Sequence, residues 1–95
     1  MKYVDVVATK DGRTLKAEVK GRTSPNQGLD TDTMFGQILR RFPELPDEKF
    51  TAAVVVPAES TSAVRRIPGW VLGRLGIMVY TVDAAGHVEI VPTDG

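Results

Sequence analysis

Three charged side chains near the N-terminus have the types and spacing needed for metal-assisted hydrolysis. Asp5 lies in one apolar-rich run, and Glu18 and Lys20 lie in the next. Paired carboxylates bind hard divalent cations such as Mg²⁺, usually together with a substrate phosphate. A neighbouring lysine can orient the attacking water or stabilise charge that develops on the phosphate. Whether these residues meet depends on how the two runs pair.

Asp11-Gly12 separates the two runs and is a strong signal for a two-residue hairpin turn, because glycine adopts positive φ without steric cost. With this turn, Asp5 pairs with Glu18 across two antiparallel strands. Strand side chains alternate between faces, so the charged and apolar pairs separate completely. One face has the pairs Tyr3–Lys20, Asp5–Glu18 and Val7–Lys16, and the other has Val4–Val19, Val6–Ala17 and Ala8–Leu15.

Opposed carboxylates roughly 5 Å apart destabilise a sheet unless something neutralises them. Two arrangements solve this problem. In the first, Lys16 and Lys20 act as diagonal counter-charges on a solvated surface, which is the usual fate of a charged face. In the second, a divalent metal lies between Asp5 and Glu18. The pattern alone favours the solvated surface, and a one-residue slip of the register would remove the pair.

The elements that follow the hairpin predict an α/β fold in one domain spanning residues 1–95. Gly21 to Asp30 is polar and reads as a loop. A helix with an apolar face then runs through Met34 and Ile38 to a stop at Pro43. Thr51 to Val56 is a continuous β-branched run, typical of a buried strand.

The remaining third of the chain predicts two helical pieces within Ser60 to Leu75, a stop at Gly76, and a second hairpin. The element order is therefore β-β-α-β-α-β-β. Right-handed crossover predicts that Lys16 to Lys20 runs parallel to Val54 to Val56. We expect a mixed sheet with helices packed on its faces.

Composition excludes several function classes. The chain has 12 basic and 12 acidic residues, so any contact with nucleic acid must come from a local cluster of cations. It has no cysteine, so thiolate metal sites and disulfides are excluded. No apolar run approaches the ~20 residues needed to span a bilayer. We expect a cytoplasmic protein without a membrane partner.

The spacing of Asp5 and the sequence Glu18-Val19-Lys20, within "AEVKGRTS", resembles the PD-(D/E)XK nuclease superfamily. This superfamily has the restriction-endonuclease-like or Holliday-junction-resolvase-like fold. The resemblance implies that Asp5, Glu18 and the carbonyl of Val19 bind Mg²⁺ or Mn²⁺, and that Lys20 assists catalysis. It also implies hydrolysis of phosphodiester bonds in nucleic acid, with DNA as the expected substrate.

Further candidates lie around this motif. Gln37 is a candidate catalytic residue on the following helix, where related families often have a glutamine, although it could equally be a solvated helix residue. Lys16, Arg22 and Arg41 are candidate nucleic-acid contacts. Gln37 and Arg41 share a helix face by their i,i+4 spacing. The alternative for helix-end arginines is interaction with the helix dipole.

The chain also departs from the superfamily pattern. Val4 stands where the motif name has proline, and the helix and strand that usually precede the aspartate strand are missing. A homodimer partner or an additional domain could complete the fold. Two alternatives to an active nuclease therefore remain: an inactive module for binding or oligomerisation, and an accessory piece of a larger nucleic-acid enzyme.

Overall fold

The computed structural model describes residues 3–21 and 27–93, and its first two strands form the predicted hairpin. Strand β1 (Tyr3–Lys10) pairs antiparallel with β2 (Arg13–Lys20), and Asp5 lies opposite Glu18. Asp11 and Gly12 have φ values of 53° and 78°. Positive φ at both central residues is the signature of a type I′ turn, whose twist matches that of the flanking strands. The predicted register is therefore confirmed.

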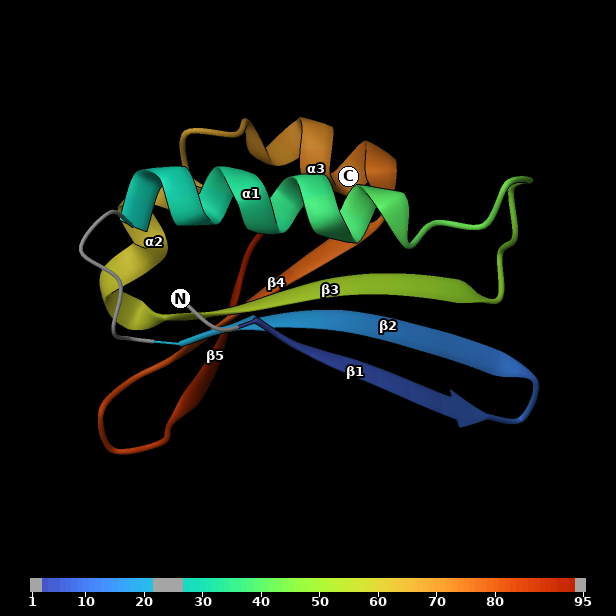
Figure 1. Ribbon diagram of the computed structural model, residues 1–95, viewed down its shortest axis with the longest axis horizontal. Helices are drawn as coiled ribbons and strands as arrows, with labels where there is room; N and C mark the ends of the chain where they lie inside the picture. The colour runs from blue at the N-terminus through green and yellow to red at the C-terminus, as the bar shows by residue number, and fades with distance from the viewer. Residues whose placement is uncertain (1–2, 22–26, 94–95) are drawn as a thin grey trace.

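Five strands form one mixed sheet in the order β1-β2-β3-β4-β5 (Figure 1). Strand β3 (Phe50–Pro57) runs parallel to β2, with Glu18 beside Val54, which confirms the predicted crossover. Strand β4 (Ile77–Val82) runs parallel to β3, and β5 (Val88–Val91) returns antiparallel as the second hairpin. The α/β class and the mixed sheet are as predicted.

Helix α1 (Gln27–Arg40) begins inside the segment predicted to be a loop. The loop was predicted from the polar, glycine-containing composition of Gly21 to Asp30, and this prediction was wrong where α1 begins. Thr31, Met34 and Ile38 are all completely buried, at the spacing of one helix face. The buried stripe therefore starts one turn before the apolar residues that marked the helix in the sequence.

The connection between β3 and β4 contains the two predicted helical pieces. A 3₁₀ turn, η1 (Ala58–Ser60), leads into α2 (Thr61–Val64), and α3 (Gly69–Leu75) follows. Gly76 ends α3 with a φ of 70°, in the left-handed region that glycine adopts readily. The predicted stop at Gly76 is therefore confirmed.

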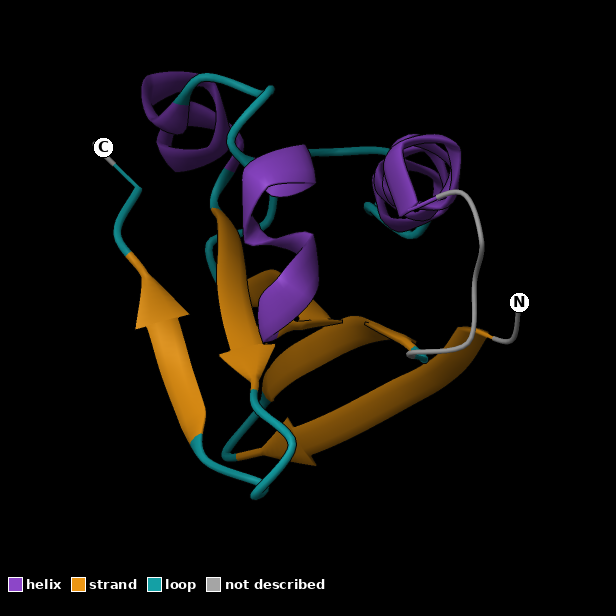
Figure 2. Ribbon diagram, turned by 90° about the vertical axis from the view of Figure 1, so that its left-hand side faces the viewer, coloured by secondary structure: helices purple, strands orange, loops and turns teal. Residues whose placement is uncertain are grey.

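All three helices lie on the same side of the sheet, so the expectation of helices on its faces holds for one face only (Figure 2). The hydrophobic core fills the space between this covered face and the helices. It includes Met34, Phe35 and Ile38 from α1 together with Val54 and Val79 from the sheet. The opposite face of the sheet, which we call the open face, has no described helix against it.

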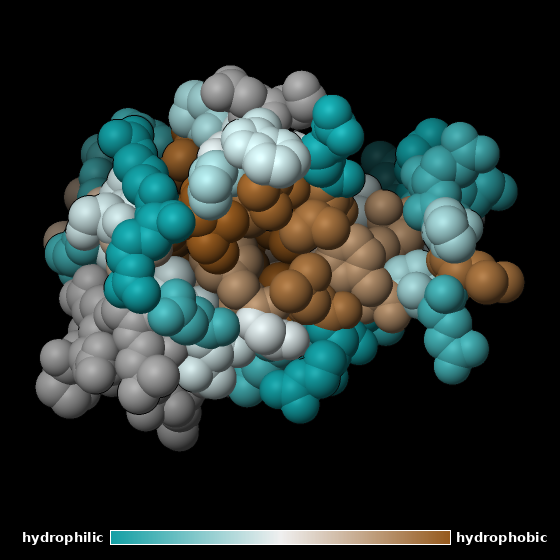
Figure 3. Space-filling view, turned by 90° about the horizontal axis from the view of Figure 1, so that it is seen from above, coloured by the Kyte–Doolittle hydropathy of each residue, from teal (hydrophilic) through white to brown (hydrophobic). Residues whose placement is uncertain are grey.

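Seen from the helix side, the molecule has an apolar hollow in its middle, bordered by hydrophilic side chains (Figure 3). Leu39 of α1 and Trp70 and Leu75 of α3 are large apolar residues that remain exposed, by 46%, 61% and 42%. The short helices thus cover the core incompletely. Among the described residues, no helix is long and apolar enough to cross a membrane.

Candidate carboxylate site

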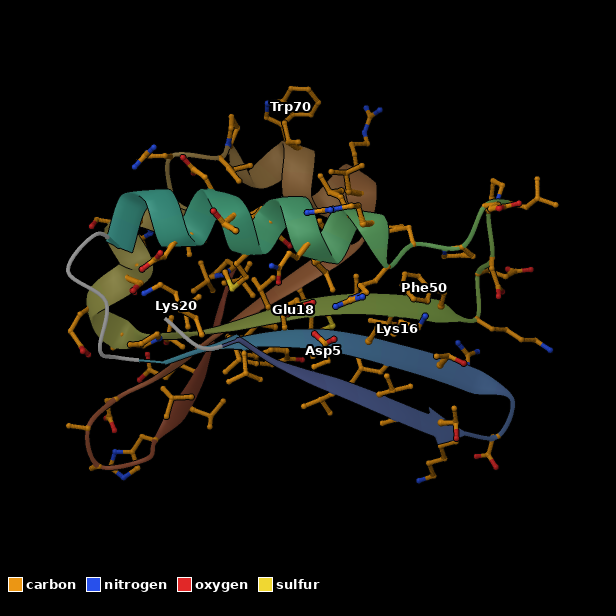
Figure 4. The ribbon with its side chains drawn as sticks, viewed as in Figure 1. Asp5, Lys16, Glu18, Lys20, Phe50 and Trp70 are labelled. Atoms are coloured by element: carbon orange, nitrogen blue, oxygen red, sulfur yellow. The ribbon has the colours of Figure 1, made fainter. Side chains whose placement is uncertain are left out.

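The candidate site lies on the covered face, beneath the C-terminal end of α1 (Figure 4). Glu18 has no exposed surface, whereas the Asp5 side chain on the edge strand is 49% exposed. Glu18 is paired with Val54 of β3, a fully buried core residue. The pair therefore has one carboxylate inside the protein and one at the rim, where solvent or a substrate can reach it.

Arg41 bridges the two carboxylates. Its Nη2 donates a hydrogen bond to Asp5 Oδ2 at 2.6 Å, and its Nε donates to Glu18 Oε1 at 3.2 Å. Arg41 follows Met34 and Ile38 at spacings of seven and three residues, so it continues the sheet-facing stripe of α1. The sequence reading assigned Arg41 to phosphate contact and missed this ion pair, although the helical spacing could have revealed it.

The pair is electrostatically asymmetric. Burial raises the pKa of Glu18, and the adjacent Asp5 carboxyl group raises it further, while Arg41 acts in the opposite direction. The adjacent Glu18 carboxyl group lowers the pKa of Asp5, and Arg41 lowers it too. Like-charged carboxylates at one site separate their titrations in this way, with one group keeping its proton longer. The site therefore favours an additional positive charge, either a proton or a cation.

One oxygen of this site lacks a partner. Glu18 Oε2 is fully buried and accepts no hydrogen bond from any described residue. A buried unpaired acceptor is costly, and buried polar atoms usually have a partner that is a protein group, a water or an ion. Oε2 is therefore an acceptor that a water or a cation would satisfy.

Lys20 lies on the same face two residues after Glu18, at a rise of roughly 7 Å along the strand. Its side chain is only 4% exposed, and its Nζ donates a hydrogen bond to Ser60 Oγ at 3.3 Å. It forms no ion pair with a described carboxylate. The solvated-surface alternative is therefore wrong for both Glu18 and Lys20, because α1 and η1 cover this part of the face.

The other candidate residues are less closely connected to the pair. Gln37 is half-buried on α1, one turn before Arg41, and its side chain makes no hydrogen bond with the described part of the chain. Val19 pairs with Val4 on one side and Val55 on the other, so its backbone lies within the sheet ladder. Arg22 lies outside the described residues. For Gln37 and Val19, the catalytic and metal-binding roles remain predictions.

A groove with a cavity volume of about 470 Å³ is lined by Arg41, which bridges the two carboxylates, although neither carboxylate lines the groove itself. Lys16, Arg40 and Arg41 supply three cations to its wall, and Glu44 and Asp47 supply two acidic groups. Phe42 and Phe50 also line the groove, and their rings meet edge to face with centroids 5.1 Å apart. The groove thus combines phosphate-binding charge with aromatic surface, and Arg41 connects it to Asp5 and Glu18.

Asp5 and Glu18 are the residues that could hold a metal here. No described group contains three or more His, Cys, Asp or Glu side chains in a metal-binding arrangement. Mg²⁺ does not require such a cage, because it commonly uses one or two carboxylates, water and substrate phosphate. The two carboxylates and the unpaired Oε2 fit a hard cation of this kind.

Comparison with protein-family models, with curated proteins and with solved structures found no match for this chain. The resemblance to the PD-(D/E)XK superfamily therefore rests on the motif and on the geometry described above.

Proposed function

We propose that this chain is a divalent-metal-dependent nuclease domain of the restriction-endonuclease-like type. It would hydrolyse phosphodiester bonds in nucleic acid, with DNA as the expected substrate and the cytoplasm as the expected location. One observation carries the proposal: Asp5 and Glu18 face each other, Arg41 connects them to a cation-lined groove, and Glu18 Oε2 is buried without a partner. Carboxylates that can bind a metal ion, close to cations that can bind phosphate, match a phosphodiester substrate.

Asp5 and Glu18 would hold Mg²⁺ or Mn²⁺. When bound, the ion would polarise the phosphoryl group and lower the pKa of a bound water. Arg41 neutralises the same two carboxyl groups through Asp5 Oδ2 and Glu18 Oε1, so its charge would compete with the ion at this site. Its side chain is 43% exposed and also lines the groove, where a phosphate would offer it new acceptors.

The remaining residues would position the substrate. Lys16 and Arg40 lie along the groove and would contact the phosphate backbone. Lys20 has its charge inside the protein without a described carboxylate partner, so an incoming phosphate would be a suitable counter-ion. In this proposal Lys20 stabilises negative charge on the scissile phosphate, and the hydrogen bond to Ser60 holds its ammonium group in place.

A plasmid-nicking assay with Mg²⁺ or Mn²⁺ tests the activity. Glu18→Gln and Lys20→Met should each lower the cleavage rate by about a hundredfold or more, because each removes a group acting on the reacting phosphate. Glu89→Gln, at an exposed carboxylate on β5, is the matched control and should cleave like the wild type. Equal cleavage by all four proteins would show that the proposed site is not responsible.

The second candidate function is an inactive module in which Arg41 is the permanent counter-ion of the pair. The observation in its favour is that Arg41 already contacts both carboxylates. In that case Arg41→Gln lowers stability and creates no new metal affinity, and neither Mg²⁺ nor Mn²⁺ supports cleavage. A titration of Mn²⁺ into Arg41→Gln, alongside a thermal melt, separates the two functions.

A further inference from the structure

The open face of the sheet is apolar across all five strands. Alternation along the strands and the observed register place four rows of side chains on it. In the described part of the chain the rows are Val6, Ala17, Ala53 and Met78; Val19, Val55, Tyr80 and Ile90; Ala8, Leu15 and Thr51; and Pro57, Val82 and Val88. None of these side chains is charged.

The apolar surface of this face is most exposed on its two edge strands, whereas Ala17, Ala53 and Pro57 at its centre are buried. Val6 on β1 is 40% exposed, and Val88 and Ile90 on β5 are 62% and 56% exposed. A hollow of about 320 Å³ lies at the β1–β2 end, where Ala8, Leu15 and Thr51 line it together with the charged residues Lys10, Asp11 and Arg13 of the hairpin end. Contiguous apolar patches of more than a few hundred Å² are rare on monomers and indicate an interaction surface.

The size of the open face is sufficient for a small dimer interface. Five strands spaced by about 4.8 Å, with about six residues each rising 3.3 Å, cover roughly 500 Å². Two such faces would bury roughly 1,000 Å² in total, near the lower limit for specific protein interfaces. We therefore expect association in the micromolar range, weaker than that of an obligate dimer.

We propose that the open face binds the open face of a second copy of this chain, forming a sheet-on-sheet homodimer. A two-fold axis brings identical surfaces together, so an uncharged apolar face is complementary to itself. Lys10 and Arg13 flank this face at the hairpin end only. With the strands of the two copies running in opposite directions, these cations lie at opposite ends of the interface and do not repel each other. This inference is independent of the proposed nuclease activity.

Val6 and Val7 provide a matched pair of positions to test the dimer. They are neighbours on β1 and both are exposed, but their side chains lie on opposite faces of the sheet. Val6→Glu places a charge in the proposed interface, and Val7→Glu places the same charge on the other face. Ile90→Glu repeats the test on β5, at the opposite edge of the sheet.

Analytical ultracentrifugation should show the wild type converting from monomer to dimer over about two decades of micromolar concentration. Val6→Glu and Ile90→Glu should each remain monomeric over this range, whereas Val7→Glu should associate like the wild type. Circular dichroism melts show whether each variant is folded, and a folded Ile90→Glu keeps the test valid if Val6→Glu unfolds.

A wild type that is monomeric throughout would overturn the proposal, as would a dimer that survives both open-face variants. Equal disruption by Val7→Glu would indicate pairing through the β1 edge and would also overturn it.

Discussion

The two faces of this sheet differ in side-chain polarity and in exposure, and each combines the two in an unusual way. The covered face contains Asp5, Lys16, Glu18 and Lys20 of the first hairpin, yet Glu18 and Lys20 are buried on it beneath helices. The open face consists of apolar residues, yet Val88 and Ile90 are more than half exposed. Burial of apolar surface is the main driving force of folding, so this distribution has a cost on both faces. We propose a different role for each face: chemistry at the charged residues of the covered face, and association through the apolar residues of the open face.

The covered face tolerates buried charge because α1 supplies a compensating cation. Met34 and Ile38 fill the core over the sheet, and Arg41 follows on the same stripe to reach both carboxylates. An ion pair of this kind rarely adds stability compared with apolar packing. Arg41 therefore has a part in both candidate functions, as a displaceable counter-ion in the nuclease and as a permanent one in an inactive module.

Truncation of one isoleucine on each face should give the largest contrast. Ile77 on β4 is 2% exposed on the covered face, and Ile77→Ala should lower the free energy of unfolding by about 2–5 kcal/mol. Ile90→Ala on the open face should change the free energy of unfolding by no more than about 0.5 kcal/mol, measured at a concentration where the protein is monomeric. Urea unfolding of both variants checks this prediction. Similar losses in both variants would show that the open face is already buried in the monomer.

Removal of the bridging cation should strengthen metal binding on the covered face. Arg41→Gln should bind Mn²⁺ about tenfold more tightly than the wild type, a common size for coupling between two competing ligands. Arg40→Gln is the matched control, because Arg40 donates to the Gly36 carbonyl on α1 and contacts neither carboxylate. Calorimetric titration measures both affinities. Unchanged binding in Arg41→Gln would mean that the metal and the guanidinium do not share a site.

Two lysines of the first hairpin test which face contacts nucleic acid. Lys16→Ala, in the groove of the covered face, should reduce the slope of log affinity against log salt by about one. Lys10→Ala, at the hairpin end of the open face, should leave that slope unchanged. Fluorescence anisotropy with a short labelled duplex measures the slope at several salt concentrations. A larger effect of Lys10 would place the DNA on the open face instead.

The smallest expected effect is on the pH dependence of stability. Because the folded-state pKa of Glu18 is raised, its contribution to stability is present at low pH and is lost as the pH rises above about 4.5. Asp5 has a lowered pKa, so its contribution is lost only as the pH falls below about 3.8. Glu18→Gln cannot ionise, and its amide can still donate to Asp5. The wild type should therefore lose stability relative to Glu18→Gln as the pH rises from 4.5 towards neutrality.

Urea unfolding of the two proteins across this pH range measures the difference directly, and titrating groups that do not interact with Glu18 cancel in the comparison. A difference that does not change with pH would mean that Glu18 has an ordinary pKa. A wild type that gains stability relative to the variant with rising pH would mean that Arg41 outweighs burial at Glu18.

The sequence predicted the elements that depend on local rules. The Asp11-Gly12 turn and strict alternation determined the hairpin register, and the strand–helix–strand order determined the parallel pairing of β2 with β3. It could not predict which face of the hairpin the helices cover, because alternation is the same for either choice. Only the packing of α1 buries Glu18 and Lys20 and brings Arg41, 23 residues away from Glu18 along the chain, onto the pair.

The most direct test of the central claim is a calorimetric titration of Mg²⁺ and Mn²⁺ into the wild type and into Glu18→Gln. It should be performed with and without duplex DNA, because Mg²⁺ often needs a phosphate to complete its ligands. We predict binding to the wild type that is lost in Glu18→Gln. Absence of binding to the wild type in both conditions, or equal binding to Glu18→Gln, would contradict a metal site at the carboxylate pair.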